Sequence, residues 1–419
     1  MEKIKKYSNG LTLAYQYSPT VRSVAIGVFV NVGSINEDSK TNGISHFIEH
    51  MMFKGTKRRT AFDIVAESDN IGAQINAFTS KTNTCYYMVC VDNDTEKCVD
   101  ILSDLFFNSV FPNEEIEKEK GVVLEEISMT IDTPDDLCLE MATSAFYKGH
   151  PLSRQILGTR KNVQGFTRED ILNYIDLHYT PDNILISVVG NITLKEVEIL
   201  INKYFIDNFS LKKSPNKQIK HFEGNSTFIK KCKKIEQSHI AFIFPSMAYC
   251  DKLTTALKVF NTAFGYGMSS RLFQNVRENL GLAYSVYSYP SFYTTNGCCS
   301  IYLGTNSNSV EKATLAVKDE IDKVLKFGIT EAEFLRGKAQ MRSAFVFGQE
   351  STSSMMTMIA RHTIMTGEAC DIDKMLLDIE NVTLDDVNEV IKQVFDFNKV
   401  TACYVGPKCD VDLLKLIKG

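Results

Sequence analysis

Three polar side chains near residue 50 have the spacing of a metal site. His46, Glu49 and His50 stand in a segment that is otherwise apolar. The apolar residues around them are Ile44, Phe47, Ile48, Met51 and Met52. In a helix, residues four apart lie one turn apart on one face, so the two imidazoles can meet one ion. Burying them with a carboxylate is unfavourable unless a divalent cation compensates. The pattern is short, however, and ordinary core histidines could also produce it.

A third ligand favours the metal, because catalytic zinc keeps three protein ligands and one open position. The segment 113–129 reads as a helix. At about 100° per residue, Glu119 and Glu126 project within about 20° of each other, whereas Glu125 points about 100° away, toward solvent. The inward arc also carries Ile116, Val122 and Val123. We therefore expect Glu126 to be the inward carboxylate and Glu119 to hold a ligating histidine. Four other glutamates are interpreted as solvated helix charges: Glu114, Glu115, Glu117 and Glu125.

The helix that carries the histidines is predicted over residues 42–55. Asn42 is the expected N-cap and Gly55 the expected C-terminal stop. Apolar residues cover most of its circumference, so it should lie largely in the interior.

The chain divides into two similar halves. A polar segment, residues 208–221, reads as a linker between residues 1–207 and 222–419. The β-rich run 23–30 echoes 238–245, and the strand pair within 71–91 echoes the pair within 281–303. Long amphipathic helices follow at 94–109 and 309–327. We predict an α+β fold of two homologous-looking domains, each a mostly antiparallel sheet with helices packed on one face. Tandem duplication explains this most simply, and chance similarity stays open.

Composition narrows the functional classes. The 419 residues carry 46 Lys and Arg against 51 Asp and Glu, a net charge of -5, which gives no electrostatic case for nucleic acid. No apolar stretch is long enough for a membrane span, and the N-terminus lacks a targeting pattern. The eleven scattered cysteines suggest reduced thiols. We expect a cytoplasmic protein that binds neither nucleic acid nor membrane.

Several motifs together resemble one family. They are His46-x-x-Glu49-His50-Met51-x-Phe53-Lys54-Gly55-Thr56, Asn76-Ala77-Phe78-Thr79, Val123-Leu124-Glu125-Glu126, Ser269-Ser270-Arg271-Leu272-Phe273 and Gly281-Leu282-Ala283-Tyr284. This set resembles the pitrilysin/insulinase family of inverted-motif zinc metallopeptidases over nearly the whole chain. Within it, the chain is most similar to the short branch typified by the β subunit of mitochondrial processing peptidase and its bacterial relatives.

The resemblance implies roles for the site residues. His46, His50 and Glu126 would bind Zn²⁺, Glu119 would support them, and Glu49 would be the general base. Zinc acidifies a water, and Glu49 would accept its proton during attack on a peptide carbonyl. The second half lacks histidines near 256–260 and acidic residues at 335–337 and 342–344, so we expect it to be metal-free.

The resemblance also implies how a substrate would be held. Asn76, Ala77 and Phe78 resemble an edge strand that pairs with the substrate main chain. Arg277 and Tyr284 resemble a pair that holds the substrate across a chamber from the zinc. From the residues alone, Arg277 would be a surface helix charge and Tyr284 an ordinary strand residue. The short loop 264–268 differs from the long glycine-rich loop of the processing peptidase's non-catalytic subunit.

Three functions remain open at this point. The first is a zinc endopeptidase that cleaves peptides or unfolded segments in an enclosed chamber, as a homodimer or as a heterodimer with a related chain. In the homodimer Arg277 and Tyr284 would act on the opposite subunit. The second is a non-catalytic structural or partner subunit, whose relatives usually lose part of the zinc motif. The third is a maturation factor that cleaves one dedicated substrate.

Overall fold

The computed structural model describes residues 3–209, 212–215 and 219–419, and the chain forms two compact units. The first contains Met1–Ile127, Arg154–Gln218 and Phe347–Asp371, and the second contains Ser128–Ser153, Ile219–Val346 and Ile372–Gly419. The two predicted domains are each continuous in the sequence. In the structure, segment 128–153 belongs to the second unit and segment 347–371 belongs to the first. Part of the predicted linker, 210–211 and 216–218, lies outside the described residues.

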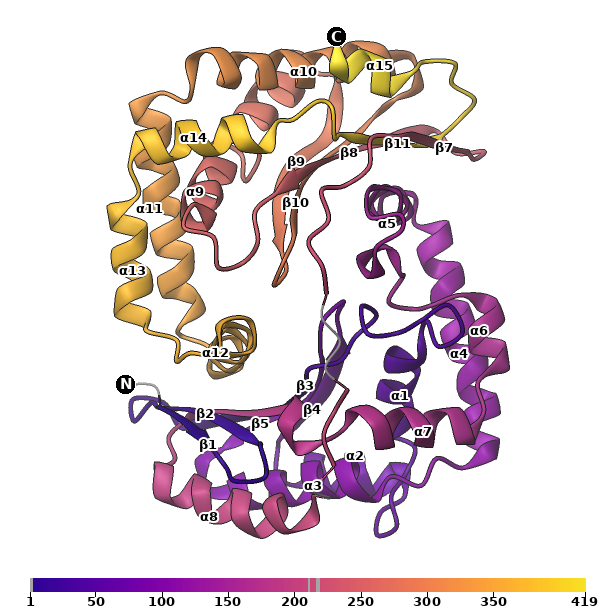
Figure 1. The fold of residues 1–419 in the computed structure, drawn as a ribbon, viewed down its shortest axis with the longest axis vertical. Helices are drawn as coiled ribbons and strands as arrows, with labels where there is room; N and C mark the ends of the chain where they lie inside the picture. The colour runs from indigo at the N-terminus through magenta and orange to yellow at the C-terminus, as the bar shows by residue number, and fades with distance from the viewer. Residues whose placement is uncertain (1–2, 210–211, 216–218) are drawn as a thin grey trace. The chain divides into compact units, whose positions relative to one another are not determined.

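The first unit is built on a six-stranded sheet with the order β1-β2-β6-β3-β5-β4 (Figure 1). Its strands are β1 (Lys3–Lys6), β2 (Thr12–Tyr17), β3 (Ser23–Val30), β4 (Gln74–Thr79), β5 (Thr84–Val91) and β6 (Ile184–Gly190). The β2–β6 pair is parallel and the other neighbours are antiparallel. Seven of the eight residues of β3 are buried, as expected for a central strand whose two faces are both covered. The predicted strand 23–30 and the predicted strand pair within 71–91 are confirmed.

Eight α-helices belong to the described part of the first unit. They are α1 (Ile44–Met52), α2 (Ala61–Asn70), α3 (Thr95–Asn108), α4 (Asn113–Asp132, whose last turn belongs to the second unit), α6 (Arg160–Gly165), α7 (Arg168–His178), α8 (Leu194–Tyr204) and α12 (Thr352–Thr366). Helices α1 and α3 both pack on β5, and α1 also contacts the edge strand β4.

The second unit repeats this plan with a five-stranded sheet in the order β7-β11-β8-β10-β9. Its strands are β7 (Phe228–Cys232), β8 (Gln237–Ser246), β9 (Ala283–Phe292), β10 (Gly297–Asn306) and β11 (Thr401–Gly406). Its helices are α5 (Pro134–Phe146), α9 (Thr254–Phe264), α10 (Val310–Phe327), α11 (Glu331–Gly348, whose last residues belong to the first unit), α13 (Ile372–Asn381), α14 (Leu384–Val394) and α15 (Leu413–Lys418).

The two sheets have one topology. Apart from the extra edge strand β1, each runs through a parallel pair (β2–β6 and β7–β11) and continues through antiparallel neighbours in the same chain order. The α+β class and the two similar domains are therefore confirmed. The shared connectivity also supports the duplication.

Each sheet carries on its second face one helix from the other half of the sequence. Helix α12 packs on β6 and β3, where Ser187 donates to the carbonyl of Met356. A Cβ at Gly27 would lie 2.7 Å from Phe29 Cε2 and 2.8 Å from Met356 Sδ, so the glycine leaves room for these two side chains. In the second unit α5 packs on β11 and β8, and Cys138 Sγ donates to the carbonyl of His239. We predicted helices on one face of each sheet only, and α12 and α5 were not expected on the second face.

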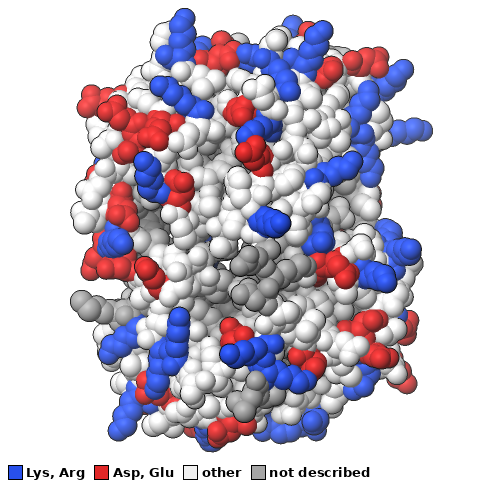
Figure 2. Space-filling view, viewed as in Figure 1, with Lys and Arg blue, Asp and Glu red and all other residues white. Residues whose placement is uncertain are grey.

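The surface carries mixed charge. On the face in Figure 2, basic and acidic side chains are interspersed over most of the visible area. Among the described residues, no helix combines the length and apolar character needed to cross a membrane.

Candidate metal centre

Helix α1 is shorter than predicted, running from Ile44 to Met52. Its apolar residues are at most 1% exposed, which confirms that the helix is largely interior. The predicted stop, Gly55, follows three residues later with a φ of 112°, a left-handed value that favours glycine.

The N-terminus of α1 differs from the prediction. Asn42 is not the N-cap, because Gly43 holds that position with a φ of 101° and offers no side chain to the helix. The Asn42 side chain instead donates to the Glu37 carboxylate at 2.9 Å and to the Gln155 carbonyl at 2.8 Å. The sequence placed a polar residue before the helix, but the carboxylate of Glu37, six residues before Gly43, takes the capping role.

His46, His50 and Glu126 converge within the first unit. Both histidine Nε2 atoms lie 3.6 Å from Oε2 of Glu126. One ligand atom from each residue can be chosen so that all three lie within 4.8 Å of one another. Donors bonded at about 2.0–2.1 Å to a tetrahedral zinc are separated by roughly 3.4 Å, so the three side chains fit that ion with small adjustments. Within the described ranges, no other His, Cys, Asp and Glu side chains cluster in this way.

The two histidines differ in their surroundings. Burial lowers the pKa of His46 to about 3, and the neighbouring His50 adds to the effect. His46 is therefore neutral near pH 7, the form in which imidazole binds a metal. Its Nδ1 atom is buried and has no hydrogen-bond partner among the described residues.

His50 is oriented by Glu119. Its Nδ1 lies 2.8 Å from Glu119 Oε1, so an ionised Glu119 accepts the Nδ1–H and leaves the Nε2 lone pair facing Glu126. Burial acts to raise the pKa of Glu119, but hydrogen bonds from His50 and Lys54 outweigh it and the pKa is lowered. Burial likewise opposes the charged form of His50, but the Glu119 hydrogen bond and nearby carboxylates raise its pKa.

Glu49 lies beside the two histidines on α1. Burial raises the pKa of its carboxyl, and a hydrogen bond from Thr79 acts in the opposite direction. Thr79 Oγ1 donates this bond to Glu49 Oε2 from the end of β4. A carboxylate with a raised pKa has the basicity that a general base needs near neutral pH.

The phase predicted for α4 is correct at the glutamates and wrong at one apolar residue. Glu119 is 4% exposed, Glu126 is half-buried and Glu125 is exposed. Val122 is 46% exposed rather than inward. The buried stripe of α4 runs through Ile116, Glu119, Val123 and Ile127. Adjacent residues differ by about 100°, so Val122 and Val123 cannot both face the core.

The strand predicted to pair with a substrate lies at the edge of the six-stranded sheet. β4, which contains Asn76, Ala77 and Phe78, is an edge strand that pairs only with β5 among the described strands. Phe78 contacts Phe29 with ring centroids 6.2 Å apart. Pairing of this strand with a substrate stays a prediction.

Arg277 and Tyr284 lie together in the second unit. The Arg277 guanidinium stands 5.5 Å from the centre of the Tyr284 ring and 4.7 Å from that of Phe273. Tyr284 is 73% exposed. The spacing seen in the sequence thus corresponds to a real contact, although the role of the pair stays a prediction.

Three residues around the site were not singled out from the sequence. Lys54 Nζ lies 2.5 Å from Glu119 Oε2, Thr79 donates to Glu49, and Glu37 accepts from the start of α1. Lys54 follows His50 by four residues, a helical spacing from which a position near His50 could have been predicted. Thr79 ends the motif 76–79 but was given no role, and Glu37 precedes α1 at no helical spacing that would predict its contact.

Two family models match the chain. Residues 12–160 match the family described as insulinase (Peptidase family M16), and residues 165–341 match the domain described as Peptidase M16 inactive domain. The chain is 38% identical over 397 residues to a Bacillus subtilis protein named uncharacterized zinc protease YmxG, covering 94% of this chain and 96% of that protein. It is 37% identical to a Rickettsia felis protein named uncharacterized zinc protease, covering 96% and 97% of the two chains.

Solved structures share the fold. A Pseudomonas fluorescens structure described as peptidase M16 inactive domain superposes with a TM-score of 0.91 at 17% identity, covering 98% of this chain and 99% of that one. A protease from Helicobacter pylori gives a TM-score of 0.89 at 22% identity, covering 97% and 99%. The chain belongs to the insulinase family of peptidases, family M16.

Proposed function

We propose that this protein is a zinc-dependent endopeptidase that cleaves peptides or unfolded segments. His46, His50 and Glu126 are its zinc ligands, and Glu49 is its general base. The observation that carries the proposal is the convergence of three ligand atoms within 4.8 Å, one of them on a histidine oriented by Glu119. The names of the relatives, which are zinc proteases, support the choice of metal.

The chemistry follows from these side chains. When bound, Zn²⁺ supplies a Lewis acid that acidifies water and polarises a peptide carbonyl. Glu49 accepts a proton from the attacking water and returns it to the leaving amine. Thr79 restricts the Glu49 carboxylate through its hydrogen bond. Glu119 keeps the His50 ring in the orientation that directs Nε2 toward the ligand cluster.

The edge strand supports an extended substrate. Among the described strands β4 pairs only with β5, so a peptide could pair with its other edge, and Thr79 at its end touches Glu49. A peptide added there as a further strand would be held through its backbone, with weak side-chain selection. This favours peptides and unfolded segments over folded proteins.

The protein works as a homodimer in this proposal. Arg277 and Tyr284 of one chain act on the metal centre of the other, within a chamber enclosed by the two copies. The contact between the two side chains supports their acting as a pair. Mixing Glu49→Gln and Arg277→Ala chains should recover part of the activity, because one of the mixed sites is intact. No recovery despite proven subunit exchange would reject the shared site.

The function is tested by incubating the purified protein with a peptide library, with and without a chelator, and identifying the products by mass spectrometry. We expect internal cleavages that the chelator abolishes and added zinc restores. A zinc-loaded protein that cleaves nothing would instead support the non-catalytic partner subunit. Cleavage confined to a single sequence would support a dedicated maturation enzyme.

A further inference from the structure

Helix α1 has no cap of its own. Its N-cap is Gly43, so no side chain at that position can satisfy the free N–H groups of the first turn. The Glu37 carboxylate does this from outside the helix. It accepts from the Gly43 N–H at 2.8 Å, the Ser45 N–H at 3.0 Å and the Asn42 side chain at 2.9 Å. Glu37 is only 1% exposed, and burial raises the pKa of its carboxyl, while these hydrogen bonds act in the opposite direction.

The chain just before α1 cannot easily move. A Cβ at Gly43 would lie 2.8 Å from both the Gly158 Cα and the Leu157 carbonyl oxygen. Asn42, which donates to Glu37, also donates to the carbonyl of Gln155. The start of α1 is therefore fastened to residues 155–158 as well as to Glu37.

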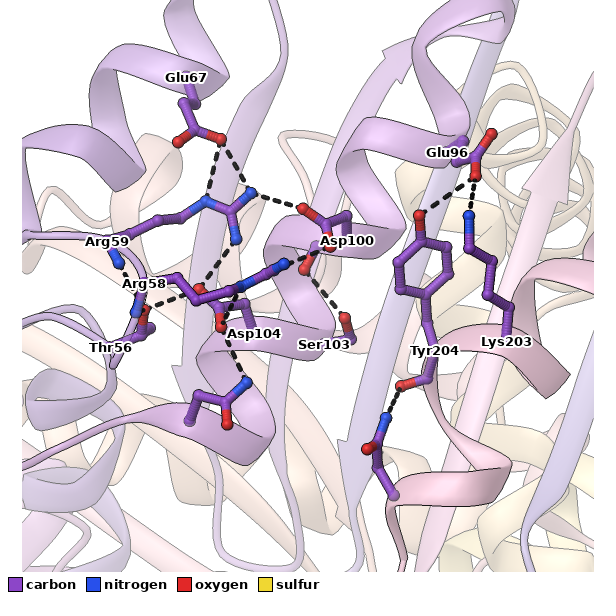
Figure 3. Close-up of polar contacts among 12 residues, drawn as sticks. Thr56, Arg58, Arg59, Glu67, Glu96, Asp100, Ser103, Asp104, Lys203 and Tyr204 are labelled. Carbon is purple, nitrogen blue, oxygen red and sulfur yellow. Dashed lines mark hydrogen bonds and ion pairs between the residues drawn. The ribbon is translucent and has the colours of Figure 1, made fainter.

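A second buried carboxylate holds the other end. Asp104, whose side chain is fully buried on α3, accepts from Thr56 Oγ1 at 2.7 Å and from Arg59 at 2.9 Å, just after α1 ends (Figure 3). Ser109 Oγ donates to the carbonyl of Met52, the last residue of α1, at 3.1 Å. The loop after α1 is thus tied to α3 and to the residue that follows it.

These two anchors bracket both histidines. His46 lies three residues after Gly43, and His50 lies two residues before Met52. A metal site tolerates ligand displacements of only about 0.2 Å, and a helix that turns by one residue rotates by about 100°. We infer that Glu37 and Asp104 are positioning residues that hold α1 at its two ends and thereby set the zinc affinity of His46 and His50. The inference rests on the proposed zinc site.

The experiment is a zinc titration of folded protein against a competing chelator, with unfolding followed separately. We expect Glu37→Gln to weaken zinc binding about tenfold or more, the scale seen when groups behind metal ligands are removed. Asp38→Asn is the matched control, because Asp38 is exposed and its hydrogen bonds stay within the turn 38–41. The zinc affinity of this variant should stay within about twofold of the wild type, a much smaller change than that caused by removing a residue that supports the metal ligands.

Asp104→Asn tests the other end in the same way, and we expect a similar loss of affinity. Its control is Asp100→Asn, which removes contacts to Arg58 and Arg59 but leaves Thr56 bound to Asp104. If Glu37→Gln does not fold, Asn42→Ala removes one donor to Glu37 and should weaken zinc binding by a smaller factor.

The outcomes separate the inference from the proposed function. A wild type that binds no zinc would reject the proposed function. A wild type that binds zinc and cleaves peptides, with variants that bind zinc equally well but unfold at lower temperature, would reject the inference and leave a purely structural role.

Discussion

Helices α1 and α9 occupy the same place in the two units and have opposite chemistry. Each follows the central strand of its sheet, β3 or β8, and precedes the next antiparallel pair. At helical spacing α1 has His46 and His50, with ring centroids 4.5 Å apart. At the same spacing α9 has Phe260 and Phe264, stacked at 5.2 Å and fully buried. One backbone plan therefore accepts either a histidine pair or an aromatic pair.

The helix opposite shows the same contrast. In the first unit α4 presents Glu119 and Glu126 to α1. In the second unit α11 approaches α9 so closely that a Cβ at Gly337 would lie 2.9 Å from the carbonyl oxygen of Val259. Space that holds carboxylates in one unit is closed by direct packing in the other. The two units thus differ in how closely these helices pack as well as in the side chains that face each other.

The largest expected effect comes from giving α1 an aromatic pair at the spacing found in α9. A His46→Phe, His50→Phe double variant should bind no zinc and cleave no peptide. Metal-free, it should unfold more easily than the metal-free wild type, because the buried Glu119 loses the hydrogen bond from His50. Elemental analysis and thermal unfolding measure both quantities. Zinc content equal to that of the wild type would refute the ligand assignment.

The next effect separates the ligands from the base. Glu49→Gln should retain zinc and fold but lose at least about a hundredfold in kcat, because the proton acceptor is gone. Peptide cleavage and zinc content are measured on the same preparation. A variant that cleaves at nearly the wild-type rate would show that another group accepts the proton.

A smaller effect is expected at α4, where two neighbouring glutamates test which face of the helix is turned toward α1. Glu126→Gln should lower zinc affinity, since it weakens a ligand. The neighbouring Glu125→Gln should not, since Glu125 is exposed. Chelator competition measures both. Loss of affinity in Glu125→Gln alone would mean that α4 is rotated by one residue.

The smallest effect concerns pH. Burial acts to raise the pKa of Asp104, but hydrogen bonds from Thr56, Arg59 and others lower it overall. A carboxyl whose pKa is depressed on folding stabilises the protein above its unfolded pKa of about 3.9 and loses that contribution as the pH falls through the folded value. We expect Asp104→Asn to cost about 1–3 kcal/mol of unfolding free energy at pH 7. The difference from wild type should shrink as the pH falls below about 4. Urea unfolding across pH measures it, and a constant difference would contradict the mechanism.

The sequence predicted what short-range periodicity determines. The spacing of His46 and His50 and the phase of Glu119 and Glu126 depend on helix geometry alone, so both could be worked out residue by residue. The strands and the repeat were also visible, because buried strands have distinctive compositions. The roles of Glu37 and Thr79 were missed because the fold of the loop before α1 and the pairing of β4 bring them to α1, and helical spacing predicts neither. The capping role assigned to Asn42 was wrong for the same reason.

The reciprocal placement of α5 and α12 makes the two halves of the chain dependent on each other for folding. A fragment ending near residue 207 would lack α12, leaving the face of β3 and β6 that contains Gly27 and Ser187 open to water. The remaining fragment would lack α5, so the face of β8 and β11 on which α5 packs would be exposed to water. A protease cut in the segment between residues 208 and 221 would therefore not yield two independent proteins. Each of the two pieces would contain the helix, α5 or α12, that covers the sheet of the other piece.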